Sequence, residues 1–257
     1  MQKIITLDLP MELDRAEIYP LSDLHIGDKY ADLNLFRKFR DHVLAAENRF
    51  IVCIGDLANN AVKSSVSNVY NETISPREQR KWLKENLAPL ADRIVVMVGG
   101  NHEERSLKDT DTDITEELAD SLRIPKAYRS NEAVVKVTLG KGYNGKKVCY
   151  LLYCIHGTGG GKKPGASINN MLDLGLSIDC DIYIMGHTHK KTAHKNTFRR
   201  VDTRNNRITD EQERLFITTS SYTAFGGYAA RGMMIPSAKG SVPVTLSGVR
   251  KEFFATV

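Results

Sequence analysis

Five short apolar segments, each followed at once by residues that can bind a metal ion, constrain this 257-residue chain more than any other feature. The segments are rich in Ile, Val and Tyr and are too short for helices, so each is predicted to be a β-strand. They occupy residues 16–21, 50–54, 94–98, 148–155 and 182–185. The residues that follow them are Ser22-Asp23-Leu24-His25, Gly55-Asp56, Gly99-Gly100-Asn101-His102, His156-Gly157 and Gly186-His187-Thr188-His189. Because open α/β sheets bind ligands beyond the carboxyl ends of their strands, these five loops are expected to meet in one cleft.

The remaining segments predict a mixed α/β (α+β) fold with helices packed on the outside of sheets. Residues 32–47 and 75–90 carry apolar side chains at helical spacing, and the second segment begins with a Ser75/Glu78 capping box. Shorter helices are predicted at 112–122 and 167–174. After His189, alternating sequence predicts antiparallel β-structure, with a hairpin at 203–206 and strands at 215–219 and 242–246. Residues 58–73 lack periodicity and are expected to form a surface loop or a lid.

Composition excludes several classes of protein. With 41% hydrophobic and 26% charged residues, the chain is typical of soluble globular proteins. No apolar run approaches the roughly 18–20 residues of a membrane helix, and no signal peptide is recognisable, so a cytoplasmic protein without a membrane partner is expected. Its four cysteines form no C-x-x-C pair and are expected to be buried, reduced thiols. Since the candidate ligands run from Asp23 to His189, residues 1–257 are expected to form one catalytic domain.

The ordered set D-x-H, G-D, G-N-H-E, H-G and G-H-T-H resembles the calcineurin-like metallophosphoesterase superfamily over residues 18–189. The glycine-rich loop HGTGGGKKPG, which begins at His156, also resembles the corresponding loop of superfamily members from phages and prophages. The resemblance implies a four-layer β-sandwich of mixed sheets flanked by helices, with a binuclear metal centre. One ion would take Asp23, His25 and His189, the other would take Asn101, His156 and His187, and Asp56 would bridge the two.

The chemistry of such a centre agrees with these residue types. Two divalent ions about 3.5–4 Å apart can hold a bridging hydroxide that attacks phosphorus in line. The ions bring four positive charges, and Asp23 and Asp56 bring two negative ones, which leaves a cationic site for a phosphate group. Carboxylate and imidazole ligands without thiolates favour Mn, with Fe, Zn, Ni or Co as alternatives, over Ca or Mg.

His102 follows a ligand but is assigned no metal. The resemblance implies that it faces the substrate, either donating to a phosphoryl oxygen or protonating the leaving oxygen as a general acid. The alternative is a structural histidine that caps the following segment. Glu103 and Glu104 either orient His102 or merely flank a helix start. Substrate contacts are expected from Asn101, Arg105 and Lys162, with an ion pair between Arg105 and a glutamate at the surface as the alternative for Arg105.

Three further segments bear on the substrate. The loop HGTGGGKKPG, beginning at His156, does not fit the phosphate-binding G-x-x-x-x-G-K-[ST] pattern, so it either lets substrate approach the backbone or is a solvated turn. Residues 190–207 carry seven basic side chains and one acidic one, a net charge of +6, while the whole chain has +5. This basic β-hairpin region, near 190–214, would either attract a polyanion such as DNA or RNA or face water. The aromatic residues in SSYTAFGGYAARG (residues 220–232) are expected to pack at the end of a sheet, with stacking on bases as the alternative.

These features favour a metal-dependent phosphodiesterase or nuclease acting on a nucleic acid or nucleotide. A phosphomonoesterase acting on proteins or small molecules is the alternative. GNHE is similar to the motif of Ser/Thr protein phosphatases, but GDLANN lacks their G-D-x-V-D-R-G, and DNA-repair nucleases usually have GNHD. A metal-free, non-catalytic nucleic-acid-binding scaffold is the least favoured reading, because every expected ligand is present. The sequence predicts no oligomeric state.

Overall fold

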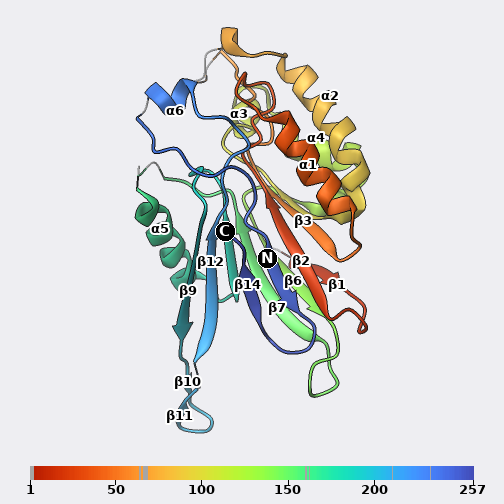
Figure 1. Cartoon of the computed structure of the whole chain (residues 1–257), viewed down its shortest axis with the longest axis vertical. Helices are drawn as coiled ribbons and strands as arrows, with labels where there is room; N and C mark the ends of the chain where they lie inside the picture. Colours follow the sequence, from red (N-terminus) through yellow and green to blue (C-terminus); the bar gives the residue numbers. More distant parts are fainter. Residues whose placement is uncertain are drawn as a thin grey trace.

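A computed structural model of the chain describes residues 3–63, 65, 69–159, 161, 163–209, 211–231 and 233–257. Two six-stranded sheets pack face to face, with helices on both outer faces (Figure 1). One sheet has the order β14-β13-β2-β3-β4-β5 and the other β1-β6-β7-β8-β12-β9. The expected four-layer arrangement of mixed sheets and flanking helices is confirmed.

All five predicted strands that precede candidate ligands are present. The strands are β1 (Ile5–Asp8), β2 (Arg15–Leu21), β3 (Arg49–Ile54), β4 (Ile94–Val98), β5 (Tyr128–Arg129), β6 (Glu132–Leu139), β7 (Val148–Ile155), β8 (Ile182–Met185), β9 (Thr192–Phe198), β10 (Val201–Asp202), β11 (Arg207–Ile208), β12 (Gln212–Thr218), β13 (Val244–Ser247) and β14 (Phe253–Ala255). The predicted hairpin is β10–β11. The segment after His189 is not purely antiparallel, because β12 pairs with β9 in antiparallel fashion but with β8 in parallel.

The four predicted helices are also present. The helices are α1 (Leu33–Leu44), α2 (Pro76–Leu87), α3 (Glu104–Thr110), α4 (Ile114–Ser121), α5 (Pro164–Ser177) and α6 (Gly227–Arg231), with 3₁₀ turns η1 (Val69–Asn71), η2 (Ala88–Arg93) and η3 (Pro125–Ala127). The capping box of α2 forms, since Ser75 N–H donates to Glu78 Oε2 at 2.8 Å and Glu78 N–H donates to Ser75 Oγ at 3.3 Å. Within the described chain, no helix is both long and apolar enough to cross a bilayer.

Strand alternation builds the core in layers. Val52 and Ile54 of β3 point between the sheets, toward residues such as Leu152 of β7. The intervening residues, Ile51 and Cys53, face the opposite way and pack against α1, α2 and α4. A third cluster packs α5 against the outer face of the other sheet. Because both faces of the central strands are buried, these strands read as continuous apolar runs in the sequence.

Two expectations need correction. Cys149 is exposed on β7, because alternate residues of a strand face opposite sides; Cys53, Cys154 and Cys180 are buried, and all four cysteines are unpaired. The start of the 58–73 segment is not at the surface, since residues 58–61 are buried. There Ile26 N–H donates to the Leu57 carbonyl at 3.0 Å and Asn59 N–H donates to the Ile26 carbonyl at 2.9 Å, which joins the two ligand loops.

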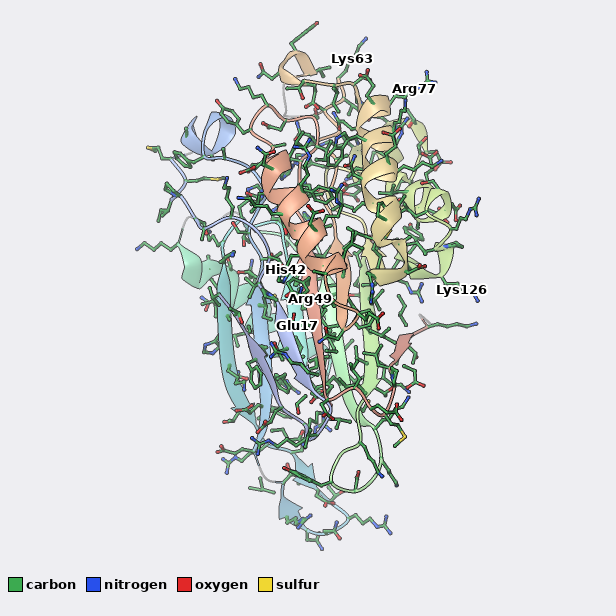
Figure 2. All side chains as sticks on the ribbon, turned by 45° about the vertical axis from the view of Figure 1, so that its right-hand side comes forward. Glu17, His42, Arg49, Lys63, Arg77 and Lys126 are labelled. Atoms are coloured by element: carbon green, nitrogen blue, oxygen red, sulfur yellow. The ribbon has the colours of Figure 1, made fainter. Side chains whose placement is uncertain are left out.

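His42, one of the two histidines outside the predicted site, has a structural role. It lies near the end of α1, beside Glu17 and Arg49 (Figure 2). The Tyr19 hydroxyl donates to Glu17 Oε2 at 2.8 Å, so it accepts from His42 Nε2, also at 2.8 Å. Arg49 completes the cluster with a 3.0 Å contact to Glu17.

Candidate metal centre

The carboxyl ends of β2, β3 and β4 in one sheet face those of β7 and β8 in the other, and the predicted ligands meet there. Six of them form two groups in which the ligand atoms lie within 4.8 Å of one another. The first group is Asp23, His25 and His189, and the second is Asp56, His156 and His187. Asn101 joins the second group, with its Oδ1 2.9 Å from His187 Nδ1 and 3.1 Å from His156 Nε2. The fold therefore brings all seven predicted ligands together.

Distances within the groups suit shared cations. His25 Nε2 lies 3.2 Å from His189 Nε2, and His156 Nε2 lies 3.2 Å from His187 Nδ1. Two nitrogen ligands of one tetrahedral ion, each about 2.0–2.1 Å from it, would be separated by roughly 3.4 Å. Asp23 Oδ1 is fully buried and has no hydrogen-bond partner among the described residues, although His189 Nε2 is 3.1 Å away. A buried carboxylate oxygen with an unused lone pair is well suited to bind a cation.

Asp56 lies between the two groups. Its Oδ2 is 3.3 Å from His156 Nε2 in the second group, and Asp56 also clusters with His25 of the first group. Its other oxygen, Oδ1, accepts the His102 N–H at 2.9 Å, which fixes the orientation of the carboxylate. This position matches the bridging role that the resemblance implies.

The backbone at these positions is strained. Ten described non-glycine residues have positive φ, and five of them are predicted ligands: Asp23, His25, Asp56, His187 and His189. Such conformations cost about 1–3 kcal/mol each in unfavourable cases and cluster at functional sites. Half of these positive-φ residues are predicted ligands, which indicates that the loops are shaped by the required positions of the ligand side chains and not by the preferred backbone conformation.

Electrostatic interactions between the carboxylates and the imidazoles shift the pKa values of residues in both groups. Burial alone would raise the pKa of Asp23, but the neighbouring His189 lowers it to about 2. Burial lowers the pKa of His25 to about 3, with His102 contributing in the same direction. For His156, burial acts downward but is outweighed by the Asp56 carboxylate, which raises the pKa to about 10. Asp56 in turn has a pKa well below its usual range, because His156 outweighs the effect of burial.

His102 stands beside the two groups and is oriented by the backbone. Its Nδ1–H donates to the Asn59 carbonyl at 2.7 Å, which directs Nε2 toward Asp56 Oδ2, 3.7 Å away. Arg105 donates to the same carbonyl at 3.0 Å, and both side chains line the cleft. Arg105 forms no ion pair with any described glutamate. Asn101 also lines the cleft, whereas Lys162 lies outside the described residues.

Two supporting residues are not evident from sequence reasoning. The buried Glu103 carboxylate accepts from the N–H groups of Asp56, Ala58 and Gly100 at 2.8, 3.0 and 3.0 Å. It therefore holds the β3 and β4 loops together rather than orienting the His102 ring directly. Asn60 Nδ2 donates to the His102 carbonyl at 2.8 Å, and Asn60 itself is anchored by the buried Gln79 of α2. Only the position of Glu103 within GNHE could have signalled this role.

The two groups open into a cleft of about 730 Å³. Of the basic segment, Lys190 lines this cleft, but the β10–β11 hairpin lies at the opposite end of the molecule from α6 (Figure 1). Arg207 lies 3.7 Å from Asp202 within the hairpin, and Arg200 pairs with Asp179. The basic character thus does not continue along the cleft as its sequence position suggests, because the seven residues of β9 carry the chain away from the site at ~3.3 Å per residue.

The mixed-sheet sandwich and its paired His/Asp groups define a protein of the metal-binding phosphoesterase class. The sequence profile described as calcineurin-like phosphoesterase matches residues 17–191, more than half of the chain. The chain therefore belongs to the calcineurin-like phosphoesterase family.

Similar solved structures share little sequence identity with this chain. Vacuolar protein sorting 29 of Cryptosporidium parvum is 17% identical, with 95% of this chain and 97% of that one covered and a TM-score of 0.46. A conserved protein of Streptococcus pneumoniae, described as a predicted phosphoesterase, is 13% identical, with coverages of 95% and 99% and a TM-score of 0.41. The calcineurin-like phosphoesterase YfkN of Bacillus subtilis is 12% identical, with coverages of 94% and 88% and a TM-score of 0.40. A comparison with curated protein sequences gives no match.

Proposed function

We propose that this protein is a binuclear metal-dependent hydrolase of phosphodiesters, with a nucleotide or nucleic acid as substrate. The observation that carries the proposal is the placement of Asp56 between two His/Asp groups at the floor of a cleft. Family membership supports hydrolysis of a phosphoester, and the cleft volume leaves room for organic groups on both sides of a phosphorus atom. A phosphomonoesterase is the alternative.

The donor set fits divalent transition metals, with Mn first and Fe, Zn, Ni or Co next. The first ion would be held by Asp23, His25 and His189, the second by Asn101, His156 and His187, with Asp56 shared. Ions bound there would supply Lewis-acid polarisation of the phosphoryl group and lower the pKa of a bound water. His156 is prepared for this role, because its Nδ1–H donates to the Ile54 carbonyl at 2.8 Å and leaves Nε2 free to bind.

His102 would act on the substrate. Its Nδ1–H is held by the Asn59 carbonyl, so only Nε2 can exchange a proton with a group in the cleft. Because Nδ1 keeps its proton, Nε2 carries one only when the ring is protonated, and that imidazolium can hydrogen-bond a phosphoryl oxygen or transfer its Nε2 proton to the leaving oxygen. Asn101, which lines the cleft beside the second group, would contact a phosphoryl oxygen through its amide.

The test combines metal analysis with a substrate panel. Purified protein is expected to retain transition metal, and with added Mn to hydrolyse bis-p-nitrophenyl phosphate faster than p-nitrophenyl phosphate. Single- and double-stranded DNA, assayed over a salt series, would show whether a polymer is bound. Protein that carries no transition metal and stays inert with Mn contradicts the proposal. Monoester turnover far above every diester favours the phosphomonoesterase instead.

A further inference from the structure

One wall of the cleft contains none of the predicted catalytic or metal-binding residues. It is formed by described residues between Thr223 and Lys239, which include part of α6 and line the same cleft as His102 and Arg105. We call these residues the 223–239 wall. Its contribution to the cleft is largely apolar, with Phe225, Ala229, Met234, Ile235 and Pro236 among the lining residues.

The position of this wall is fixed relative to the metal ligands. Tyr222, immediately before it, is buried, and its N–H donates to the carbonyl of the ligand Asp23 at 2.9 Å. Ala224 N–H then donates to the Tyr30 carbonyl at 2.8 Å, and Lys239 at the far end pairs with Asp32. The 223–239 wall is therefore attached at both ends to the 23–32 segment, which itself carries the ligands Asp23 and His25.

Phe225 stands out within the wall. Tyr222 packs on Phe39 with ring centroids 5.8 Å apart, as expected for an aromatic residue at the end of a sheet. Phe225, by contrast, is 52% exposed and lines the cleft. Tyr30, which lies against Gly226 and Gly227, lines it as well, as does Ile235. An exposed aromatic side chain beside a cationic site offers an apolar face to whatever the phosphate carries.

The size of the cleft limits what that can be. A volume of about 730 Å³ lies in the range of sites for small ligands, about 300–1,000 Å³. With the phosphoryl group at the metal groups, the apolar lining available to the organic substituent of the ester is that of the 223–239 wall and Tyr30. A planar ring suits this space best, because it can stack on an aromatic face, and the polar residue Thr223 also lines the cleft.

We propose that Phe225, together with Tyr30 and Ile235, forms a subsite for a planar heterocycle of nucleobase size that is joined to the scissile phosphate. This inference rests on the proposed phosphodiesterase function and narrows its substrate to nucleotides, either free or at the end of a single strand. The distant β10–β11 hairpin is not needed for such recognition.

Two chromogenic diesters that share a leaving group test the proposal directly. Thymidine 5′-(p-nitrophenyl phosphate) and methyl p-nitrophenyl phosphate both release p-nitrophenolate, so only the remaining substituent differs. The wild-type protein with Mn is expected to prefer the thymidine ester by about 5- to 100-fold in kcat/KM, mostly through KM. Phe225→Ala should remove most of that preference, and Phe225→Trp should retain it.

Phe254 provides a matched control. It lies on β14, is 53% exposed, and is not among the residues that line the cleft. Phe254→Ala should leave the ratio of the two esters unchanged. Binding of thymidine 5′-monophosphate to the Mn-loaded protein, measured by calorimetry, gives a second readout without turnover, and should weaken in Phe225→Ala while binding of inorganic phosphate does not.

The outcomes separate the inference from the function. If the wild-type protein hydrolyses neither ester, the proposed function fails. If it hydrolyses both equally, or if Phe225→Ala leaves the preference intact, the function stands and the subsite is overturned. A comparison of the free dinucleotide with a ten-nucleotide single strand then shows which source of the base is preferred. A preference for duplex over both would also overturn the subsite, since paired bases offer no free ring.

Discussion

The Nδ1–H group of His156 donates a 2.8 Å hydrogen bond to the carbonyl of Ile54. His156 follows β7 in one sheet, and Ile54 ends β3 in the other, so this bond joins the two sheets at the floor of the cleft. It also fixes the orientation of the ring, which directs Nε2 toward Asp56 and His187. A structural contact between the layers thereby prepares a metal ligand.

Metal binding is expected to release a proton from His156. Without metal, the Asp56 carboxylate raises the pKa of His156 to about 10, so the ring is protonated at pH 7. A histidine ligand must be neutral, so metal affinity should rise as the pH rises from 6 toward 9. Calorimetric titration with Mn in two buffers of different ionisation enthalpy should show a proton released to the buffer at pH 7. His156→Gln should release fewer protons, whereas His42→Gln should behave as wild type; equal release in all three would contradict this assignment.

Asp56→Asn should disrupt both metal groups at once. The carboxylate lies between them, and an amide supplies neither its charge nor two equivalent ligand oxygens. We expect the metal content to fall below one ion per chain and kcat/KM to fall by about 10³-fold or more. Metal content is measured by mass spectrometry and folding by circular dichroism. The exposed Asp41→Asn change on α1 serves as control, and retention of two ions by Asp56→Asn would refute the shared position.

His102→Gln should lower kcat by about 10²- to 10⁴-fold without changing the metal content. Proton donation matters most when the leaving group is basic. The loss should therefore be larger for a dinucleotide, which releases an alkoxide, than for a diester that releases p-nitrophenolate. An equal loss with both substrates would show that His102 binds the phosphoryl group rather than protonating the leaving oxygen.

Glu103→Gln should destabilise the fold. Three backbone N–H groups donate to the buried carboxylate, and an amide must turn its NH₂ group toward at least one of them. The expected loss is about 1–3 kcal/mol in the free energy of unfolding, measured with urea. Glu104→Gln is the matched control, because Glu104 is exposed and its ion pair among the described residues is with Lys108 on the next turn. A change of similar size in both variants would argue against the role of Glu103.

Local patterns were sufficient for the strands that precede the ligands and for the four predicted helices, but β6 was not predicted, although its burial alternates along Glu132–Leu139. The buried strands before the ligand loops are short apolar runs in the sequence, and the capping box of Ser75 and Glu78 indicates where α2 begins. Strand β9 lies in the region after His189 where alternating sequence predicted antiparallel β-structure, and its antiparallel pairing with β12 confirms that prediction, although its sequence, TAHKNTF, is almost wholly polar. Helix α3 was not predicted, because it is short and begins at Glu104, directly after the GNHE motif.

What the sequence by itself determined is the identity and order of the chemical groups: seven candidate ligands and His102, each placed just after an apolar strand. Strand ends can be read locally, because alternation and turn residues act over a few positions. Only the tertiary structure decided which groups meet, that Glu103 ties two loops together, and that Phe225 faces the cleft while Tyr222 is buried. The tertiary structure also places the basic β10–β11 hairpin away from the site (Figure 1). The physical reason is that a strand's direction and its neighbours are set by packing between sheets, and no local pattern along the chain records them.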